Sequence, residues 1–189
     1  HSSQQTATTF LQYSDSVIFV GTKHLGLYML SLSNDGYQVQ VCSATEHNME
    51  EIKALLADDK GTLWILTNKG LFSLTATQIS TADMQPRTHF TDVQFTQATC
   101  VSGSYVLFGT QHNGLLLYNS HIDKFDYFQN STLTNCGISH LSCIPDGGII
   151  VGTDGGYAYI ISPDLKHTTQ LHYHGEGEYN VETVFVDKF

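Results

Sequence analysis

One pattern recurs four times along this chain: a short apolar run ends in a threonine, and a second apolar run opens after a glycine a few residues later. The marker threonines are Thr22, Thr67, Thr110 and Thr153, spaced 45, 43 and 43 residues apart. A nearly fixed period of this size indicates one supersecondary unit repeated, each copy too small to bury its apolar face alone. The four segments are VIFVGTKHLGLYML (17–30), LWILTNKGLFSL (63–74), VLFGTQHNGLLLY (106–118) and IIVGTDGGYAYI (149–160).

The apolar runs have the length and composition of β-strands. They are about four to eight residues long and rich in Val, Ile, Phe, Tyr and Leu. Turn sequences such as Asp58–Gly61 and Pro145–Gly148 separate them. Four strands of about five residues with their turns fill one period, which is the size of a propeller blade. The sequence therefore predicts an all-β protein, a β-propeller fragment of about four blades of four antiparallel strands in a partial ring.

The second repeat carries a family resemblance. Residues 52–74, IKALLADDKGTLWILTNKGLFSL, resemble the two-component regulator propeller repeat: a strand, Asp-x-x-Gly, a Trp-containing strand ending in Gly-Thr, then Gly-Leu. Leu66 stands where the family has glycine, and the other three repeats keep Gly-Thr but lack the tryptophan. The matching residues are Asp58, Gly61, Trp64, Thr67, Gly70 and Leu71. The family comprises periplasmic sensor regions of hybrid two-component histidine kinase/response regulators of Bacteroidetes.

The repeat spacing also divides the chain. We expect a polar leader at 1–7 and a partial propeller over 8–189. The segment 181–188, VETVFVDK, has the phase of MEEIKALLADDK in the second repeat, so it predicts the first strand of a fifth blade. Exposed blade edges would then favour self-association, or a dimer of sensor domains. The expected repeats are 8–45, 46–90, 91–133, 134–178 and the start of a fifth at 179–189.

Composition narrows the partners. The chain has 189 residues, 41% of them hydrophobic, and a net charge of −10. Nucleic acid is not an expected partner, because its binding relies on basic residues that neutralise phosphates. No apolar run reaches the roughly 18 residues of a membrane span, so the chain itself is not expected to be embedded in a membrane.

Candidate binding residues lie directly after the marker threonines. Equivalent loops of a propeller emerge on one rim, and loops on a rigid scaffold often carry function. Solvated turns would have the same composition, so the alternative for each residue is a turn without function. The candidate ligand-binding residues are His24, Asn68, Lys69, Gln111, His112 and Asp154.

Catalytic and metal motifs find little support. The chain lacks G-x-S-x-G, a Walker loop and S-x-x-K, so we expect no catalytic residue and no cofactor. His172 and His174 could face a divalent metal, but an exposed polar outer strand is the preferred explanation for them. Cys100 and Cys143 occupy equivalent positions on first strands, and we expect buried thiols there in preference to a disulfide.

The resemblance implies a function. It predicts a ligand-sensing periplasmic segment of a hybrid two-component regulator that responds to a carbohydrate, with a small molecule or oligosaccharide as ligand. Any kinase activity would reside elsewhere in the parent chain. Two alternatives remain. A metal-dependent propeller hydrolase or lyase would use residues of the first strands, of which Gln12, Cys100, His140 and Cys143 are the polar candidates. A non-catalytic protein-interaction propeller would use the same fold.

Overall fold

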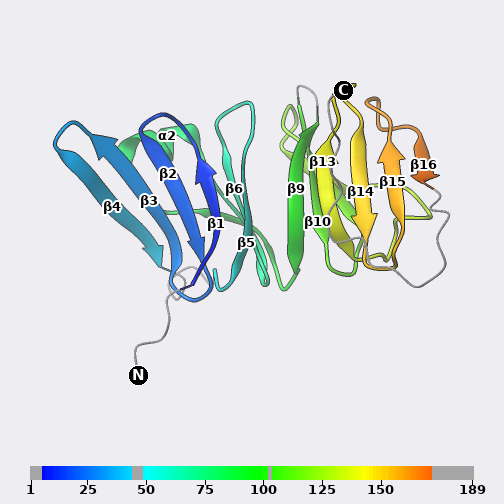
Figure 1. The fold of residues 1–189 in the computed structure, drawn as a ribbon, viewed down its shortest axis with the longest axis horizontal. Coiled ribbons are helices and arrows are strands. Elements are labelled where there is room, and N and C mark those ends of the chain that lie inside the picture. Colours follow the sequence, from blue (N-terminus) through cyan, green and yellow to red (C-terminus); the bar gives the residue numbers. More distant parts are fainter. Residues whose placement is uncertain (1–5, 44–48, 102–103, 172–189) are drawn as a thin grey trace. The chain divides into compact units, whose positions relative to one another are not determined.

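The computed structural model describes residues 6–43, 49–101 and 104–171. Within them every four consecutive strands form one antiparallel sheet, in the order of the sequence. Figure 1 shows the four sheets following one another along the colour bar. The predicted all-β fold of propeller-blade sheets is therefore confirmed. The expected fifth repeat at 179–189, together with His172 and His174, lies outside the described residues.

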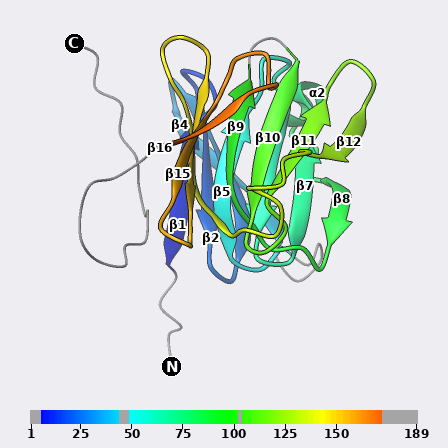
Figure 2. The ribbon, with the colours of Figure 1, turned by 90° about the vertical axis from the view of Figure 1, so that its right-hand side faces the viewer.

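The strands have the following bounds. Sheet 1 contains β1 (Ala7–Gln12), β2 (Val17–Thr22), β3 (Gly26–Ser33) and β4 (Gly36–Ser43). Sheet 2 contains β5 (Ile52–Ala57), β6 (Leu63–Thr67), β7 (Gly70–Leu74) and β8 (Arg87–Thr91). Sheet 3 contains β9 (Phe95–Val101), β10 (Tyr105–Thr110), β11 (Leu115–Asn119) and β12 (Lys124–Tyr127), with β12 at its edge in Figure 2. Sheet 4 contains β13 (Ile138–Cys143), β14 (Ile149–Thr153), β15 (Ala158–Ile161) and β16 (Thr168–Leu171).

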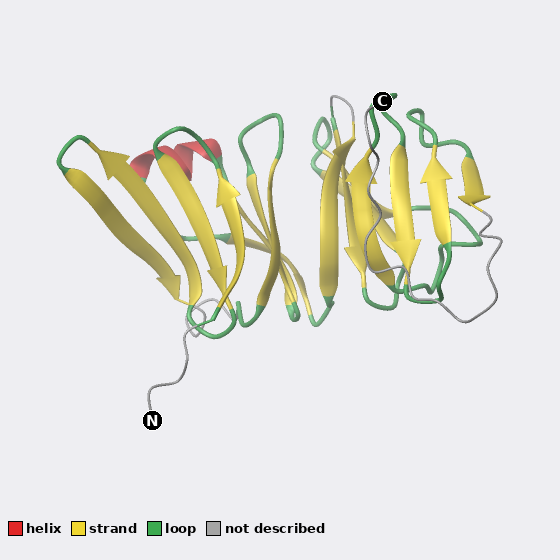
Figure 3. Ribbon diagram, viewed as in Figure 1, coloured by secondary structure: helices red, strands yellow, loops and turns green. Residues whose placement is uncertain are grey.

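A short helix interrupts sheet 2, and the repeat pattern did not predict it. Helix α2 (Ala76–Thr81) connects β7 to β8 and is drawn in red in Figure 3. A capping box fixes its start, because Thr75 accepts from the backbone N–H of Gln78 while the Gln78 side chain accepts from the backbone of Thr75. Ala82 ends it in the left-handed conformation. The Thr-x-x-Gln spacing was the available sequence signal.

The marker threonines close the turn between the second and third strands of each sheet. Each is buried and donates its hydroxyl to a backbone carbonyl at the start of the third strand or in the turn before it, three or four residues on, at 2.8–3.0 Å. Each hydroxyl also accepts a backbone N–H from the same turn. The four donor–acceptor pairs are Thr22–Gly26, Thr67–Gly70, Thr110–Gly114 and Thr153–Tyr157. The repeat marker thus has a structural role, and we call the two hydrogen bonds of each marker hydroxyl the threonine clasp of its turn.

Replacing Thr110 with valine is expected to lower the free energy of unfolding by about 1–2 kcal/mol, because the buried Gly114 carbonyl and the partly buried Asn113 N–H lose their hydroxyl partner. The hydroxyl of Thr110 bonds the Gly114 carbonyl at 2.9 Å and the Asn113 N–H at 2.8 Å. Urea denaturation followed by circular dichroism measures the change. Thr110→Ser keeps the hydroxyl and should lose less, whereas Thr91→Val on an exposed strand should be neutral. Equal losses at positions 110 and 91 would contradict the clasp.

Within each unit, a threonine of the first strand of one sheet bonds to the next sheet. The β1–β2 register shifts between Ala7 and Thr9, which leaves Thr8 unpaired in the ladder. The Thr8 hydroxyl donates to the Ile52 carbonyl of sheet 2 at 2.5 Å. In sheet 3, Thr96 makes the same bond to Ile138 of sheet 4 at 2.6 Å.

Two glycines, Gly21 and Gly109, leave room for the next sheet at these contacts. A Cβ at Gly21 would lie 2.7 Å from the Ile52 side chain, and one at Gly109 would lie 2.7 Å from that of Ile138. In these two repeats, the absence of a side chain before the marker threonine therefore allows the next sheet to approach closely. The second repeat has Leu66 here, and this side chain is fully buried.

The chain divides into two compact units, His1–Phe95 and Thr96–Phe189. In the first unit one core cluster contains side chains of sheets 1 and 2, among them Phe19, Met29, Ile65 and Phe72. In the second unit the corresponding cluster contains Leu107 and Leu115 of sheet 3 with Val151 and Ile161 of sheet 4. Within each unit the two sheets thus pack face to face through apolar side chains.

Candidate functional site

The six candidate residues all lie on the clasped turns that follow the marker threonines. His24 lies between β2 and β3, and Asn68 and Lys69 lie between β6 and β7, all in the first unit. Gln111 and His112 lie between β10 and β11, and Asp154 follows β14, all in the second unit. The structure therefore defines two groups of three residues, and each group is described within its own unit.

In the first unit, backbone bonds gather the two turns around one residue. Glu51 precedes β5 and adopts a left-handed conformation with φ 49°. Its N–H donates to the carbonyl of Lys23 at 2.8 Å, and its carbonyl accepts from the N–H of Asn68 at 3.3 Å. The turn that carries His24 and the turn that carries Asn68 and Lys69 thus meet at the same segment.

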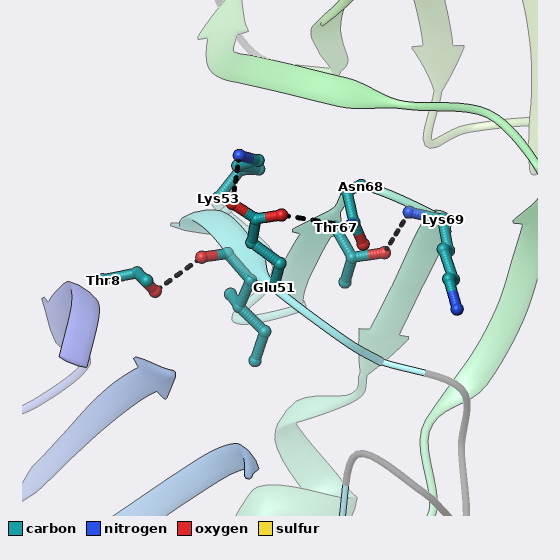
Figure 4. Close-up of polar contacts among 7 residues, drawn as sticks. Thr8, Glu51, Lys53, Thr67, Asn68 and Lys69 are labelled. Carbon is teal, nitrogen blue, oxygen red and sulfur yellow. Dashed lines mark hydrogen bonds and ion pairs between the residues drawn. The ribbon is translucent and has the colours of Figure 1, made fainter. Parts of the chain in front are cut away.

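Side chains around Glu51 form a polar cluster, and Figure 4 shows Glu51, Lys53, Asn68 and Lys69 of it. One carboxylate oxygen of Glu51 pairs with Lys53 at 2.6 Å, and the other accepts from the Asn68 amide at 3.1 Å. Lys69 forms an ion pair with Glu50 at 2.9 Å. We call Glu50, Glu51, Lys53, Asn68 and Lys69 the first-unit polar cluster.

Glu51 is ionised in this cluster. The hydrogen bond from Lys53 holds the pKa of its carboxyl below the usual range, against a smaller opposing contribution from burial. The charges of Lys23 and His24 act in the same direction as Lys53. The negative charge of Glu51 therefore lies close to the positive charges of Lys53 and Lys23.

In the second unit, the residue before the first strand meets the neighbouring turn through different contacts. Gly137 takes the place of Glu51, sixteen residues before its marker threonine. Its carbonyl accepts from the N–H of Asp154 at 3.0 Å, and its own N–H donates to the Asp154 carboxylate at 3.2 Å. A Cβ at Gly137 would lie 2.2 Å from that carboxylate and 2.6 Å from the Gln111 carbonyl. A side chain like that of Glu51 is therefore excluded at this junction.

These contacts separate the six candidates into two kinds. Asn68, Lys69 and Asp154 are engaged with neighbouring groups that hold the turns together. The Oδ1 atom of Asn68 is buried and has no hydrogen-bond partner among the described residues, so solvent reaches little of this amide. Of the six candidates, His24, Gln111, His112 and Asp154 are exposed, whereas Asn68 and Lys69 are half-buried. The Asp154 carboxylate is already engaged, because it accepts from the Gly137 N–H.

Sequence reasoning missed Glu50, Glu51 and Lys53. They lie just before or at the start of β5, whereas the candidates predicted from the sequence lie only on the turns after the marker threonines. An antiparallel pairing offered the signal, because the beginning of a first strand lies beside the end of the second strand, where the marker threonine stands. The observed pairing of Ile52 with Thr67 is this arrangement.

The structure changes the reading of other side chains. Cys143 is exposed and its sulfur lies 3.2 Å from the Thr99 hydroxyl, so the expectation of a buried thiol there was wrong. It stands at the end of β13, where the strand leaves the core. The side chain of Cys100 lies outside the described part. Trp64 and Phe108 are buried.

Metal ligands do not converge in the described part of the chain. Among residues 6–43, 49–101 and 104–171, no group of three or more His, Cys, Asp or Glu side chains is arranged to hold an ion. Of the first-strand candidates for a metal enzyme, Gln12 is exposed on β1, and His140 and Cys143 share β13. The described helices include none with the length and hydropathy of a membrane span.

Comparison with known proteins establishes the class of fold. No family model and no curated protein matches the chain in sequence. Solved structures match nearly its whole length. The extracellular domain assigned to the one-component system BT4673 of B. thetaiotaomicron is 24% identical, with a TM-score of 0.67 over 96% of this chain and 24% of that one.

Two further structures are similar. The extracellular domain assigned to the hybrid two-component system BT3049 of B. thetaiotaomicron is 17% identical, with a TM-score of 0.64 over 94% of this chain and 23% of that one. PorZ, a bacterial surface component of the type-IX secretion system of Porphyromonas gingivalis, is 8% identical, with a TM-score of 0.60 over 89% of this chain and 23% of that one. The chain thus spans about a quarter of each, and at these identities the likeness shows the fold.

Proposed function

We propose that this chain is a ligand-sensing segment of an extracytoplasmic receptor in two-component signalling. The observation that carries the proposal is the match of 94–96% of the chain to extracellular domains assigned to a one-component system and a hybrid two-component system. The repeat resemblance in 52–74 points to the same class independently of the structure. By this proposal the segment is periplasmic, belongs to an inner-membrane protein and performs no chemistry itself.

Ligand contact falls to the exposed turns. His24 in the first unit, and Gln111 and His112 in the second, each offer imidazole or amide groups that donate and accept hydrogen bonds, which suits the hydroxyl groups of an oligosaccharide. Asn68, Lys69 and Asp154 contribute to binding indirectly, because their bonds fix the conformation of the turns that carry the ligand-contacting side chains. A rigid turn loses less entropy when a ligand binds.

Calorimetric titration with a panel of neutral and acidic oligosaccharides tests the proposal. We expect one class to bind the wild-type chain, and the triple variant His24→Ala, Gln111→Ala, His112→Ala to bind it at least about tenfold more weakly, which corresponds to about 1.4 kcal/mol. The substituted side chains are exposed, so the melting temperature should stay the same.

Lys166→Ala is the matched control. Lys166 is exposed in the β15–β16 turn, which lies at the opposite end of sheet 4 from Asp154, and its loss should leave affinity unchanged. Unchanged affinity in the triple variant would refute the assignment of these turns. Absence of binding to every saccharide would refute carbohydrate sensing.

A protein-interaction scaffold is the second candidate. The likeness to PorZ, a component of a secretion system, favours it. A scaffold would bind no oligosaccharide, yet the same triple variant would lose a protein partner captured by cross-linking in the native host.

A further inference from the structure

Both units use the same kind of contact between consecutive sheets. Sheet 2 contributes Leu63, Ile65, Phe72 and Leu74 to the core it shares with sheet 1. Sheet 4 contributes residues at the same repeat positions, Ile149, Val151, Tyr159 and Ile161, to the core it shares with sheet 3. We call the face that carries these four positions the leading face of a sheet. The opposite, trailing face of sheet 1 carries Phe19, Leu27 and Met29.

The leading face of sheet 1 is open. Its four equivalent positions follow when the repeats are aligned on the marker threonine and on the third strand that follows the turn. They are Ile18, Val20, Tyr28 and Leu30, and all are partly exposed. Their counterparts in sheet 2 are all 1% exposed or less. Five further apolar side chains of sheet 1 are exposed: Phe10 (69%), Leu32 (45%), Tyr37 (68%), Val39 (47%) and Val41 (49%).

Strand register places these side chains on one surface. Phe10 pairs with Val20, Val20 with Tyr28, and Tyr28 with Val41. A second row runs from Ile18 through Leu30 to Val39. Residues paired across neighbouring strands point to the same side of a sheet, so the two rows form one uncharged face that is apolar except for Gln12, which pairs with Ile18 on β1. Soluble monomers rarely leave such a face uncovered.

The outer strand distinguishes this face from its counterparts. In sheet 4, Tyr159 and Ile161 pair with Gln170 and Thr168 of the outer strand. In sheet 2, Phe72 pairs with Thr88. The corresponding outer positions in sheet 1 are Val41 and Val39 on β4. The apolar surface of sheet 1 therefore extends across all four strands.

We propose that the leading face of sheet 1 is a docking surface for a further blade of the same repeat, which presents a trailing face like that of sheet 1 itself. The two observed sheet pairs define what that blade supplies. It offers apolar side chains at the positions of Phe19, Leu27 and Met29, and a first-strand threonine. Ala7 stands fifteen residues before its marker threonine, as Ile52 and Ile138 do, so its carbonyl is the acceptor for that hydroxyl.

A second copy of the same leading face fits less well. In both observed pairs, unlike faces meet, and the threonine hydroxyl of the trailing face bonds a carbonyl of the leading one. Two leading faces would bring no such donor to Ala7. The contacts seen within the two units therefore favour a further blade over a dimer in which two leading faces meet.

An extended chain tests the proposal. A second copy of residues 7–51, inserted directly before Ala7, adds one blade with its natural connection. Val39→Cys in the original sheet 1 then reports coverage of the face through its rate of maleimide labelling, located by peptide mass spectrometry. We expect labelling at least about tenfold slower in the extended chain than in the 189-residue chain, because a covered side chain reacts only when the contact opens.

The control removes the contact and keeps the added residues. Phe19→Asp and Leu27→Asp, placed only in the added copy, should restore fast labelling. Equal labelling in the two chains would overturn the proposal. Slow labelling in the 189-residue chain that speeds up on dilution would also overturn it, since a second copy would then cover the face.

Discussion

Replacing Trp64 with alanine is expected to lower the free energy of unfolding by about 3–5 kcal/mol, the range for loss of a large buried aromatic side chain. The indole is 1% exposed and packs on His89 with ring centroids 5.1 Å apart. Its Nε1 donates to the Asp58 carboxylate at 2.9 Å, and the same carboxylate accepts the N–H groups of Lys60 and Thr62. The substitution therefore leaves a cavity and removes one bond from the turn before β6.

Urea denaturation followed by circular dichroism measures this loss, since Trp64 is the only tryptophan and its fluorescence disappears in the variant. Trp64→Phe separates packing from hydrogen bonding, because it keeps an aromatic ring but removes the donor, and should cost about 1–3 kcal/mol. If alanine cost no more than phenylalanine, packing of the indole would not be the main contribution.

Gly109→Ala is expected to destabilise the second unit by about 1–3 kcal/mol through overpacking. The new Cβ would lie 2.7 Å from Cγ2 and 2.8 Å from Cβ of Ile138, so sheet 4 must shift away from sheet 3. That shift would also strain the bond between Thr96 and the Ile138 carbonyl. Thermal and urea unfolding measure the effect.

Gly155→Ala is the matched control, because the nearest atom to a Cβ there is 3.5 Å away in the Tyr157 side chain. It should be neutral or slightly stabilising. Gly109→Ala combined with Ile138→Ala provides a second check, since the smaller side chain relieves the clash and the two effects should fall short of their sum. Strict additivity would mean that the two residues do not meet.

Much of the fold could be predicted from the repeat. The spacing of the marker threonines predicted strands, sheets of four and the propeller class, and the structure confirms these. Helix α2 was missed because its six residues carry no amphipathic period, although Thr75 and Gln78 form a recognisable cap. Such local insertions leave the period of the repeat nearly unchanged.

Less of the candidate site could be predicted. The sequence located the turns that carry His24, Asn68 and Asp154, but did not tell which side chains would remain exposed. That outcome depends on the residue before each first strand. Glu51 reaches Lys53 and Asn68 in one unit, whereas Gly137 leaves room for Asp154 in the other.

The sequence by itself determined the blade. A period of 43–45 residues, alternating strands and a buried threonine at each hairpin are local features, and local bonds enforce them. Tertiary structure decided everything that depends on a neighbouring sheet: the close approach at Gly21 and Gly109, the assembly of the polar cluster around Glu51, and the open face of sheet 1. The physical reason is that hydrogen bonds within a hairpin join residues a few positions apart, whereas packing between sheets joins positions more than forty residues apart, which no local pattern encodes.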